Sequence, residues 1–292
     1  MTQFLLQIAL AGLAQGSLFA LTALGLVMIY NASSVVNFAH GAMGMAATYV
    51  AYVLIARFEV PFALAFAAAL VAAFVLGAIV QAVFLARLRN APLLSQVVVT
   101  LGLFMLLEGL MGIAFGYNPR PMRESIAIAP VILGDLVLRP QDVLQLALLL
   151  ILGVALAAFF AATKVGLGMR AITENTYAAR LMGIPVGRLL AVAWGTGVAL
   201  SAVAAVLAAP TTAVTPNMMD TIVVYGFVAA IVGGFGSMAG ALVGGLILGV
   251  VVNLIDAFLA PELAMSIVFG LLLLVLYVRP DGLFGRAQVQ KV

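Results

Sequence analysis

The sequence alternates between long apolar runs and short polar stretches. Its first Asp, Glu, Lys or Arg is Arg57, and this uncharged start is too long for one span because about 20 residues cross a bilayer core. We therefore expect two spans, residues 4–30 and 36–56, separated by polar residues 31–34 that can satisfy freed backbone groups. Polar and small residues at 37–44 predict that the second span begins as a distorted or half-inserted helix beside a cavity.

Apolar runs of helical length continue through the rest of the chain. They predict spans over residues 62–86, 93–116, 143–162, 189–209, 221–232, 241–258 and 263–278. Glycine-rich residues 233–240 predict a re-entrant break, so the total is eight or nine spans, depending on how this break and the first pair are counted. The predicted fold is an all-α polytopic membrane protein with at least one broken or re-entrant segment, in a single membrane domain over residues 1–292.

Composition supports this class and excludes several functions. The chain is 66% hydrophobic and 8% charged, whereas soluble domains carry roughly 25% charged residues. It has no cysteine and one histidine, His40, so disulfides, thiolate metal sites and cysteine nucleophiles are excluded and a histidine metal site is not expected. With no nucleotide-binding loop and no paired intramembrane acids, we expect neither an enzyme nor a bound cofactor.

Two features orient the predicted spans. If Arg87 and Arg89 lie inside, alternation places nine of the 13 basic residues inside and four outside, as the positive-inside rule requires. Nine spans then put the N-terminus outside, and eight put it inside. The only tryptophan, Trp194, opens the span over residues 189–209, and we expect it at interface depth.

The longest polar interruption, residues 164–188, contains a short helix with its own end signals. Asn175 is a plausible N-cap, Gly183 can end the helix in the left-handed conformation, and Pro185 prevents its continuation. Its apolar stripe comprises Tyr177, Ala178, Leu181 and Met182. This stripe fits either a partner's groove or the lipid headgroups, and shape alone favours neither.

Other residues are candidates for a solute path. Ser34, Asn37 and His40 are polar groups near or within a span, and a break at Gly233 and Gly234 could form part of a site. The structural alternatives are a satisfied core histidine and close helix packing by small residues, namely Gly236, Gly240, Gly244, Gly245 and Gly249. The carboxyl group of Glu108, in the middle of a span, must be protonated, paired with a cation or hydrated by water. We favour a hydrogen-bonded structural role for it over proton coupling.

Three stretches, residues 25–43, 168–183 and 233–244, resemble the permease subunits of bacterial branched-chain amino acid ABC importers of the LivH type. The resemblance implies an ABC importer permease fold in the bacterial inner membrane. It also implies a second permease (a related heterodimer partner, or a second copy), two ATPase subunits that bind the ATP, and a periplasmic binding protein. Contact with membrane lipid is expected, and nucleic acid is not.

In that family the cytoplasmic loop carries a coupling helix that docks on the ATPase. The resemblance maps this role onto Glu174, Asn175, Tyr177, Ala178, Arg180, Leu181, Met182 and Gly183. One departure is Thr176-Tyr177, where relatives often have Pro-Glu. Our hypothesis for the wall of the translocation path comprises Ser34, Asn37, His40, Gly41, Gly233, Gly234 and Ser237.

Alternative functions remain open at this point. The solute is expected to be leucine, isoleucine or valine, although related systems carry urea, short amides or aromatic acids. A secondary transporter coupled to protons through Glu108 or His40 would work without ATPases. A membrane scaffold would use the helix after Asn175 only to recruit a soluble protein. The basic loop with its capped helix favours the importer, and the polar break at residues 31–40 favours transport over scaffolding.

Overall fold

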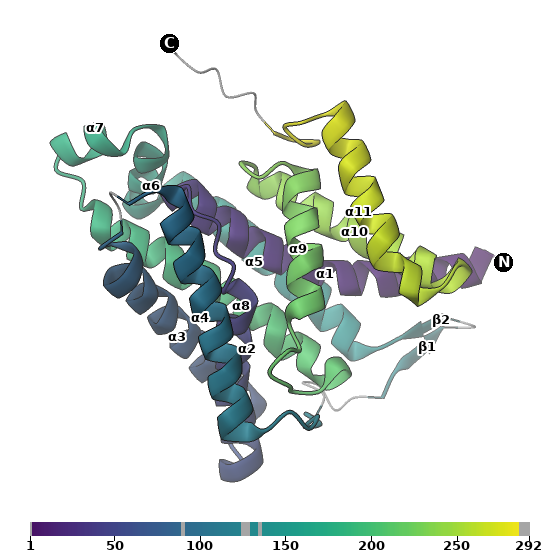
Figure 1. Ribbon diagram of the computed structural model, residues 1–292. Helices are drawn as coiled ribbons and strands as arrows, with labels where there is room; N and C mark the ends of the chain where they lie inside the picture. The colour runs from purple at the N-terminus through teal and green to yellow at the C-terminus, as the bar shows by residue number, and fades with distance from the viewer. Residues whose placement is uncertain (1, 89–90, 124–128, 134–135, 286–292) are drawn as a thin grey trace.

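The computed structural model describes residues 2–88, 91–123, 129–133 and 136–285. Eight helices in this part are long and apolar enough to cross a membrane. They are α1 (Thr2–Ser33), α2 (His40–Phe58), α3 (Phe62–Val80, continued by a π-helical turn Gln81–Leu85), α4 (Leu93–Phe115), α5 (Pro140–Ala162), α8 (Val186–Thr212), α10 (Met238–Phe258) and α11 (Pro261–Val278). The shorter elements are α6 (Lys164–Glu174), α7 (Thr176–Leu181), α9 (Asp220–Gly233) and the antiparallel hairpin β1 (Val131–Leu133) and β2 (Leu136–Leu138). The predicted all-α polytopic class is confirmed (Figure 1).

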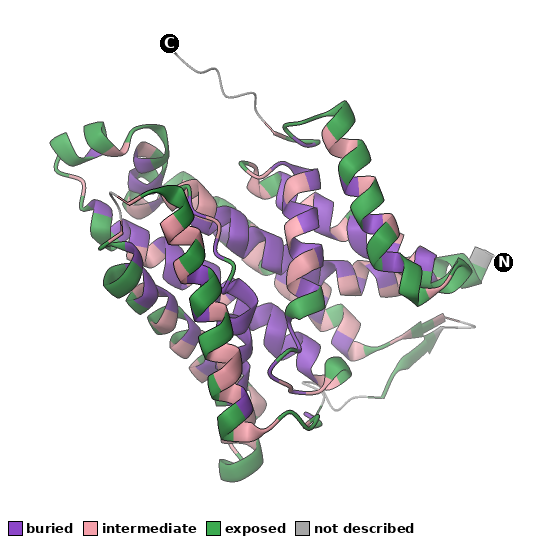
Figure 2. Ribbon diagram, in the orientation of Figure 1, coloured by how far each residue is buried: buried purple, intermediate pink, exposed green. Residues whose placement is uncertain are grey.

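Two helices form the centre of the bundle. Most of α1 and α8 is buried, whereas many residues of α4 and α11 are exposed (Figure 2). Large apolar side chains are exposed on α4, α5 and α11. The α1 helix packs against α8, α9 and α10, and α8 packs against α2 and α3. The exposed apolar side chains of the outer helices are suited to contact with lipid or with another membrane subunit.

Glycines bring α1 and α10 into close contact. A Cβ atom on Gly249 would collide with the backbone of Gly16, and one on Gly245 would collide with the backbone of Ala20. Gly240 and Gly244 pack in the same way on the end of α9. The predicted packing role of the small residues is therefore confirmed at these four glycines. It is wrong for Gly236, where an added Cβ would meet nothing within 4 Å.

The ends of the helices lie on two opposite sides. On the loop side, which carries α6 and α7, Thr173 bonds the end of α1 and the backbone of Phe284 bonds Gly233 at the end of α9. On the hairpin side, Gln7 near the start of α1 bonds Val137 of β2, and the loop before α9 pairs with the loop after α4. The two ends of the described chain thus lie on opposite sides, which requires an odd number of crossings.

Helix α9 supplies the ninth crossing. It starts near the hairpin side and ends on the loop side, although its 14 residues span only about 21 Å. Non-helical residues 213–219 and 234–237 complete its passage. The sequence left eight or nine spans open, and only the count of nine placed the start of α1 on the side opposite the basic loop, where the structure has it.

The second crossing begins as the sequence predicted, with irregular backbone. Helix α1 continues to Ser33, Ser34 has a positive φ of 55°, and residues 35–37 are neither helix nor strand. Asn37 Oδ1 then accepts a hydrogen bond from Ala39 N (3.0 Å), just before α2 begins. A Cβ on Gly25 would lie 2.7 Å from the His40 ring. Gly25 lies two turns before the end of α1, and His40 is the first residue of α2. Helix α2 therefore starts inside the bundle, at the depth of Gly25.

Three sequence predictions were incomplete or wrong. Residues 164–174 form the amphipathic helix α6, which was not predicted because its polar residues break the hydropathy pattern. The loop after α4 contains the β1–β2 hairpin, which was also not predicted. Trp194 is fully buried in the core instead of lying at an interface. Gly77 explains this position, because a Cβ on Gly77 would collide with the Trp194 backbone and its absence lets α3 cover that face of α8.

Candidate functional site

The loop between α5 and α8 folds into two capped helices. The Thr163 side chain accepts a hydrogen bond from Gly166 N and caps α6. Asn175 Oδ1 accepts one from Ala178 N (2.9 Å), and Gly183 after α7 has a φ of +77°. The predicted N-cap and left-handed helix end are therefore confirmed, because each side chain or backbone angle takes the geometry that its residue type favours.

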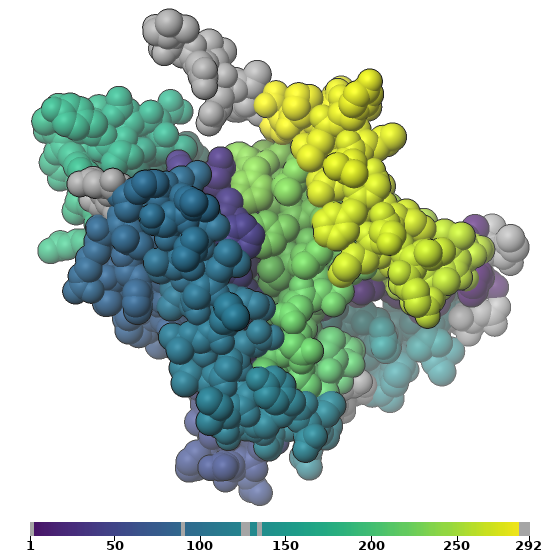
Figure 3. All heavy atoms as spheres, in the orientation of Figure 1, coloured from purple at the N-terminus to yellow at the C-terminus, as the bar shows by residue number. Residues whose placement is uncertain are grey.

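The predicted apolar stripe of α7 is on the surface. Tyr177 and Leu181 are each 72% exposed and Met182 is 82% exposed, while Ala179 faces inward and is buried. Glu174 and Arg180 flank the stripe and are exposed. Helix α7 projects from the body of the molecule (Figure 3). This short projecting helix with uncovered apolar side chains can enter a groove on another protein.

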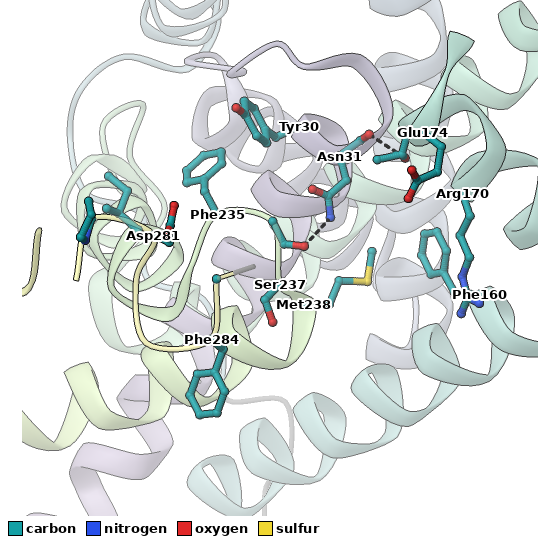
Figure 4. Close-up of a pocket in the computed structure, with 15 residues that line it drawn as sticks. Tyr30, Asn31, Phe160, Arg170, Glu174, Phe235, Ser237, Met238, Asp281 and Phe284 are labelled. Carbon is teal, nitrogen blue, oxygen red and sulfur yellow. Dashed lines mark hydrogen bonds between the residues drawn. The ribbon is translucent and has the colours of Figure 1, made fainter. Parts of the chain in front are cut away.

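A cavity of about 880 Å³, the loop-side cavity, lies between α6 and the ends of α1 and α9. Its lining residues are Tyr30, Asn31, Phe160, Arg170, Thr173, Glu174, Ile231, Phe235, Gly236, Ser237, Met238, Pro280, Asp281, Phe284 and Gly285. Asp281 and Phe235 lie across it from Glu174 and Arg170 (Figure 4). The structure therefore brings the coupling prediction (Glu174) and the path prediction (Ser237) to one cavity.

Hydrogen bonds link three elements at the wall of this cavity. Thr173 Oγ1 donates to the backbone oxygen of Asn31 (2.9 Å), and Asn31 Nδ2 donates to the backbone oxygen of Gly236 (3.3 Å; Figure 4). The Asn31 carbonyl belongs to the last turn of α1 and has no acceptor role within that helix, so Thr173 satisfies it. Helix α6 is thereby joined through the end of α1 to the turn between α9 and α10.

That turn is the predicted glycine break. Gly233 packs on the backbone of Gly240, and Gly234 has a φ of +104°, which favours glycine. Ser237 accepts a hydrogen bond from Gly240 N (3.0 Å) and caps α10. The backbone of Leu283 and Phe284 bonds the end of α9 (2.8 and 3.0 Å) and covers the glycines. Gly233 and Gly234 are therefore buried in a tight turn, and Ser237 reaches the cavity.

A second cavity of about 270 Å³, the lateral cavity, lies between the start of α2, the middle of α4 and α9. Its lining residues are Phe38, Gly41, Ala42, Leu101, Phe104, Asp220, Val223, Val224 and Phe227. Asp220 is the only charged residue among these described lining residues. Gly41 was predicted from the sequence and Asp220 was not, although Asp220 is the only acidic residue between Glu174 and Asp256 and opens an apolar helix.

The other predicted path residues lie elsewhere. Asn37 and His40 are buried, and the His40 backbone oxygen accepts a hydrogen bond from Ser201 Oγ (2.9 Å). Ser34 is exposed at the end of α1, and Glu108 is half-buried on α4. These four residues line neither the loop-side nor the lateral cavity. The seven residues predicted to line the path thus do not form one wall within this chain, and their role in translocation stays a prediction.

The chain is similar to known transport permeases over most of its length. Residues 8–276 match the family model described as branched-chain amino acid transport system / permease component. The chain is 30% identical to the high-affinity branched-chain amino acid transport system permease protein LivH of Escherichia coli K12, with 99% of this chain and 98% of LivH aligned.

Two further relatives extend this similarity. BraD, a high-affinity branched-chain amino acid transport system permease protein of Pseudomonas aeruginosa, is 29% identical over 98% of both chains. A probable branched-chain amino acid transport permease protein LivH of Methanocaldococcus jannaschii is 28% identical over 92% of this chain and 89% of that protein. No solved structure matches this chain. This chain is therefore a multi-pass membrane protein that belongs to the family of permease components of branched-chain amino acid transport systems.

Proposed function

We propose that this chain is a membrane-spanning subunit of an ABC importer for leucine, isoleucine and valine. The observation that carries the proposal is the match of residues 8–276 to a permease family, together with near full-length relatives named for branched-chain amino acid transport. The subunit would sit in the bacterial inner membrane with the loop side in the cytoplasm. Its partners would be a second permease, two ATPases and a periplasmic binding protein.

In this assembly the chain itself has no catalytic step to perform. The ATPases would bind and hydrolyse ATP, and α7 would transmit their movement. Support for the docking role of α7 comes from its exposed apolar stripe and from the caps that fix its two ends. Because the family is one of multi-component transport systems, a docking partner explains the stripe better than lipid headgroups do.

The hydrogen bonds at the loop-side cavity provide a route from α7 into the membrane domain. Helix α6 directly precedes α7, and its Thr173 donates a hydrogen bond to the backbone of Asn31. The Asn31 side chain in turn donates a hydrogen bond to the backbone of Gly236. A shift of α6 would move the end of α1 and the α9–α10 turn together. These elements surround the loop-side cavity, so the shift would widen or narrow the cytoplasmic exit of the path.

The docking assignment is tested by adding a charge to the stripe. Ala178→Asp places a carboxylate on the exposed face of α7 without touching the Ala178 N–H that Asn175 caps. We expect loss of ATPase co-purification and of ATP hydrolysis stimulated by the loaded binding protein. Asn118→Asp adds the same charge to an exposed residue on the hairpin side and should change neither.

Two results would contradict the proposal. If Ala178→Asp leaves the stimulated ATP hydrolysis unchanged, α7 does not have the docking role. A wild-type chain that imports leucine with no ATPase present would refute the importer assignment, and Glu108→Gln would then test whether the transport is coupled to protons.

A further inference from the structure

The lateral cavity combines an apolar wall with a single carboxylate. Apart from Asp220, its described lining residues are aliphatic, aromatic or glycine. Its volume is about 270 Å³. A site for one water needs only about 10–15 Å³ of such space, so the cavity has room for a molecule of several non-hydrogen atoms, such as an amino acid. Its dimensions therefore fit a small solute better than a large one.

The carboxylate and the apolar groups lie on one face of α9. Val223 and Val224 follow Asp220 by three and four positions, which places all three side chains next to one another on the helix surface. A carboxylate binds an ammonium group through a charge-assisted hydrogen bond. An amino acid held at Asp220 by its ammonium would therefore direct an aliphatic side chain toward the two valines.

Aromatic and aliphatic side chains form the opposite walls of the cavity. The rings of Phe38 and Phe227 stack with centroids 5.6 Å apart and close the cavity between the irregular start of α2 and the middle of α9. Gly41 lies against Val223, and a Cβ on Gly41 would collide with the Val223 side chain. Leu101 and Phe104 of α4 complete the wall. The absence of a side chain at Gly41 is what gives Val223 its position at the cavity.

We propose that the lateral cavity is a transit site for the imported amino acid, with Asp220 holding its ammonium and Val223, Val224 and Phe104 contacting its aliphatic side chain. The proposal rests on the proposed function and deepens it by selecting among solutes. Urea and short amides carry no ammonium group for Asp220 to bind. Val223 packs against Gly41 and fills part of the cavity, so we expect its side chain to disfavour the larger side chains of aromatic amino acids.

The first test measures uptake by the complete importer in proteoliposomes supplied with the binding protein. We expect Asp220→Asn to lower leucine uptake at least tenfold while the complex still assembles. Val223→Ala should raise phenylalanine uptake relative to leucine at least threefold. Thr221→Val is the matched control, because Thr221 is exposed on the same helix turn and does not line the cavity.

A second test reads the site directly and does not depend on turnover. The chain has no cysteine, so Val224→Cys gives one thiol for a membrane-permeant maleimide. We expect leucine to slow labelling of this thiol at least fivefold in the assembled complex, and urea to leave the rate unchanged. Adding Asp220→Asn should remove the protection by leucine.

The outcomes separate the proposal from the function on which it rests. A wild-type complex that does not import leucine refutes the proposed function. A wild-type complex that imports leucine, with Asp220→Asn kinetics unchanged and no protection at Val224→Cys, refutes the transit site alone. The transit site is also refuted if a phospholipid or a second permease blocks labelling of the Val224→Cys thiol to the same extent with and without leucine.

Discussion

Thr173→Val should uncouple ATP hydrolysis from import without unfolding the loop. The change keeps the shape of the side chain and removes the hydroxyl that reaches Asn31 O across 2.9 Å. The same hydroxyl lies 3.0 Å from Met169 O within α6, and that carbonyl keeps its own helical N–H partner at Thr173. Helix α6 should therefore remain folded, and the loss should fall on its link to α1.

The size of the effect follows from where this bond lies. Thr173 is exposed and Asn31 is half-buried, so water can replace the lost donor. The net contribution of the bond then falls in the lower part of the usual range, about 0.5–1 kcal/mol. This free energy corresponds to a roughly two- to fivefold fall in leucine imported per ATP hydrolysed. Thr176→Val is the control, because its hydroxyl bonds only Ile172 O of the preceding turn.

The double variant tests whether the two hydrogen bonds act in series. Asn31→Leu removes the bond to Gly236 and keeps the backbone oxygen that Thr173 contacts. If movement passes from α6 to Asn31 and then to Gly236, breaking either bond interrupts the same route. The double variant should then be no worse than the more severe single variant. If the losses of leucine import per ATP add in the double variant, the two hydrogen bonds are independent contacts. If neither single variant changes the leucine imported per ATP, the proposed route is refuted.

Three further predictions concern folding and docking. Gly249→Ala should destabilise the protein by about 1–3 kcal/mol, because the added Cβ would meet backbone of α1 that cannot move aside. Gly270→Ala on exposed α11 is the control, because its Cβ would meet nothing within 4 Å and the change should be neutral or stabilising. Thermal unfolding in detergent measures both variants. Asn175→Ala should cost α7 about 1 kcal/mol of cap energy and lower solute-stimulated ATP hydrolysis, and Asn175→Asp should restore it, which a hydrolysis assay will show. Fluorescence of the single Trp194 should be blue-shifted and resist quenching by brominated lipid, because the side chain is fully buried; strong quenching would contradict its place in the core.

The membrane spans could be predicted closely because hydropathy alone determines them. The run over residues 93–116 became α4 (Leu93–Phe115), and the run over residues 62–86 became α3 with its π-helical turn. The α7 caps were equally accessible, since Asn175 and Gly183 act through local geometry. Signals of this kind depend on a few neighbouring residues and do not require the tertiary structure.

Features that join distant segments could not be predicted in the same way. The lateral cavity needs Phe38, Phe104 and Asp220 to meet, and no local pattern places these three segments side by side. Trp194 was misplaced because its burial depends on Gly77, more than a hundred positions earlier. Asp220 looked like the end of a polar connection, and only the cavity beside it distinguishes it from an ordinary residue at a helix start.

Helix α9 connects the two cavities. Asp220 and Val223 near its start line the lateral cavity, and Ile231 near its end lines the loop-side cavity. The turn that follows α9 accepts the hydrogen bond from Asn31 at Gly236. A displacement of α6 and α7 that reaches this turn therefore acts on the same short helix that carries Asp220. Its 14 residues are too few to fill a bilayer core of about 30 Å, and irregular backbone flanks α9 on both sides. If α7 docks on an ATPase and Asp220 holds the solute, as proposed, α9 is the element that would link the two events.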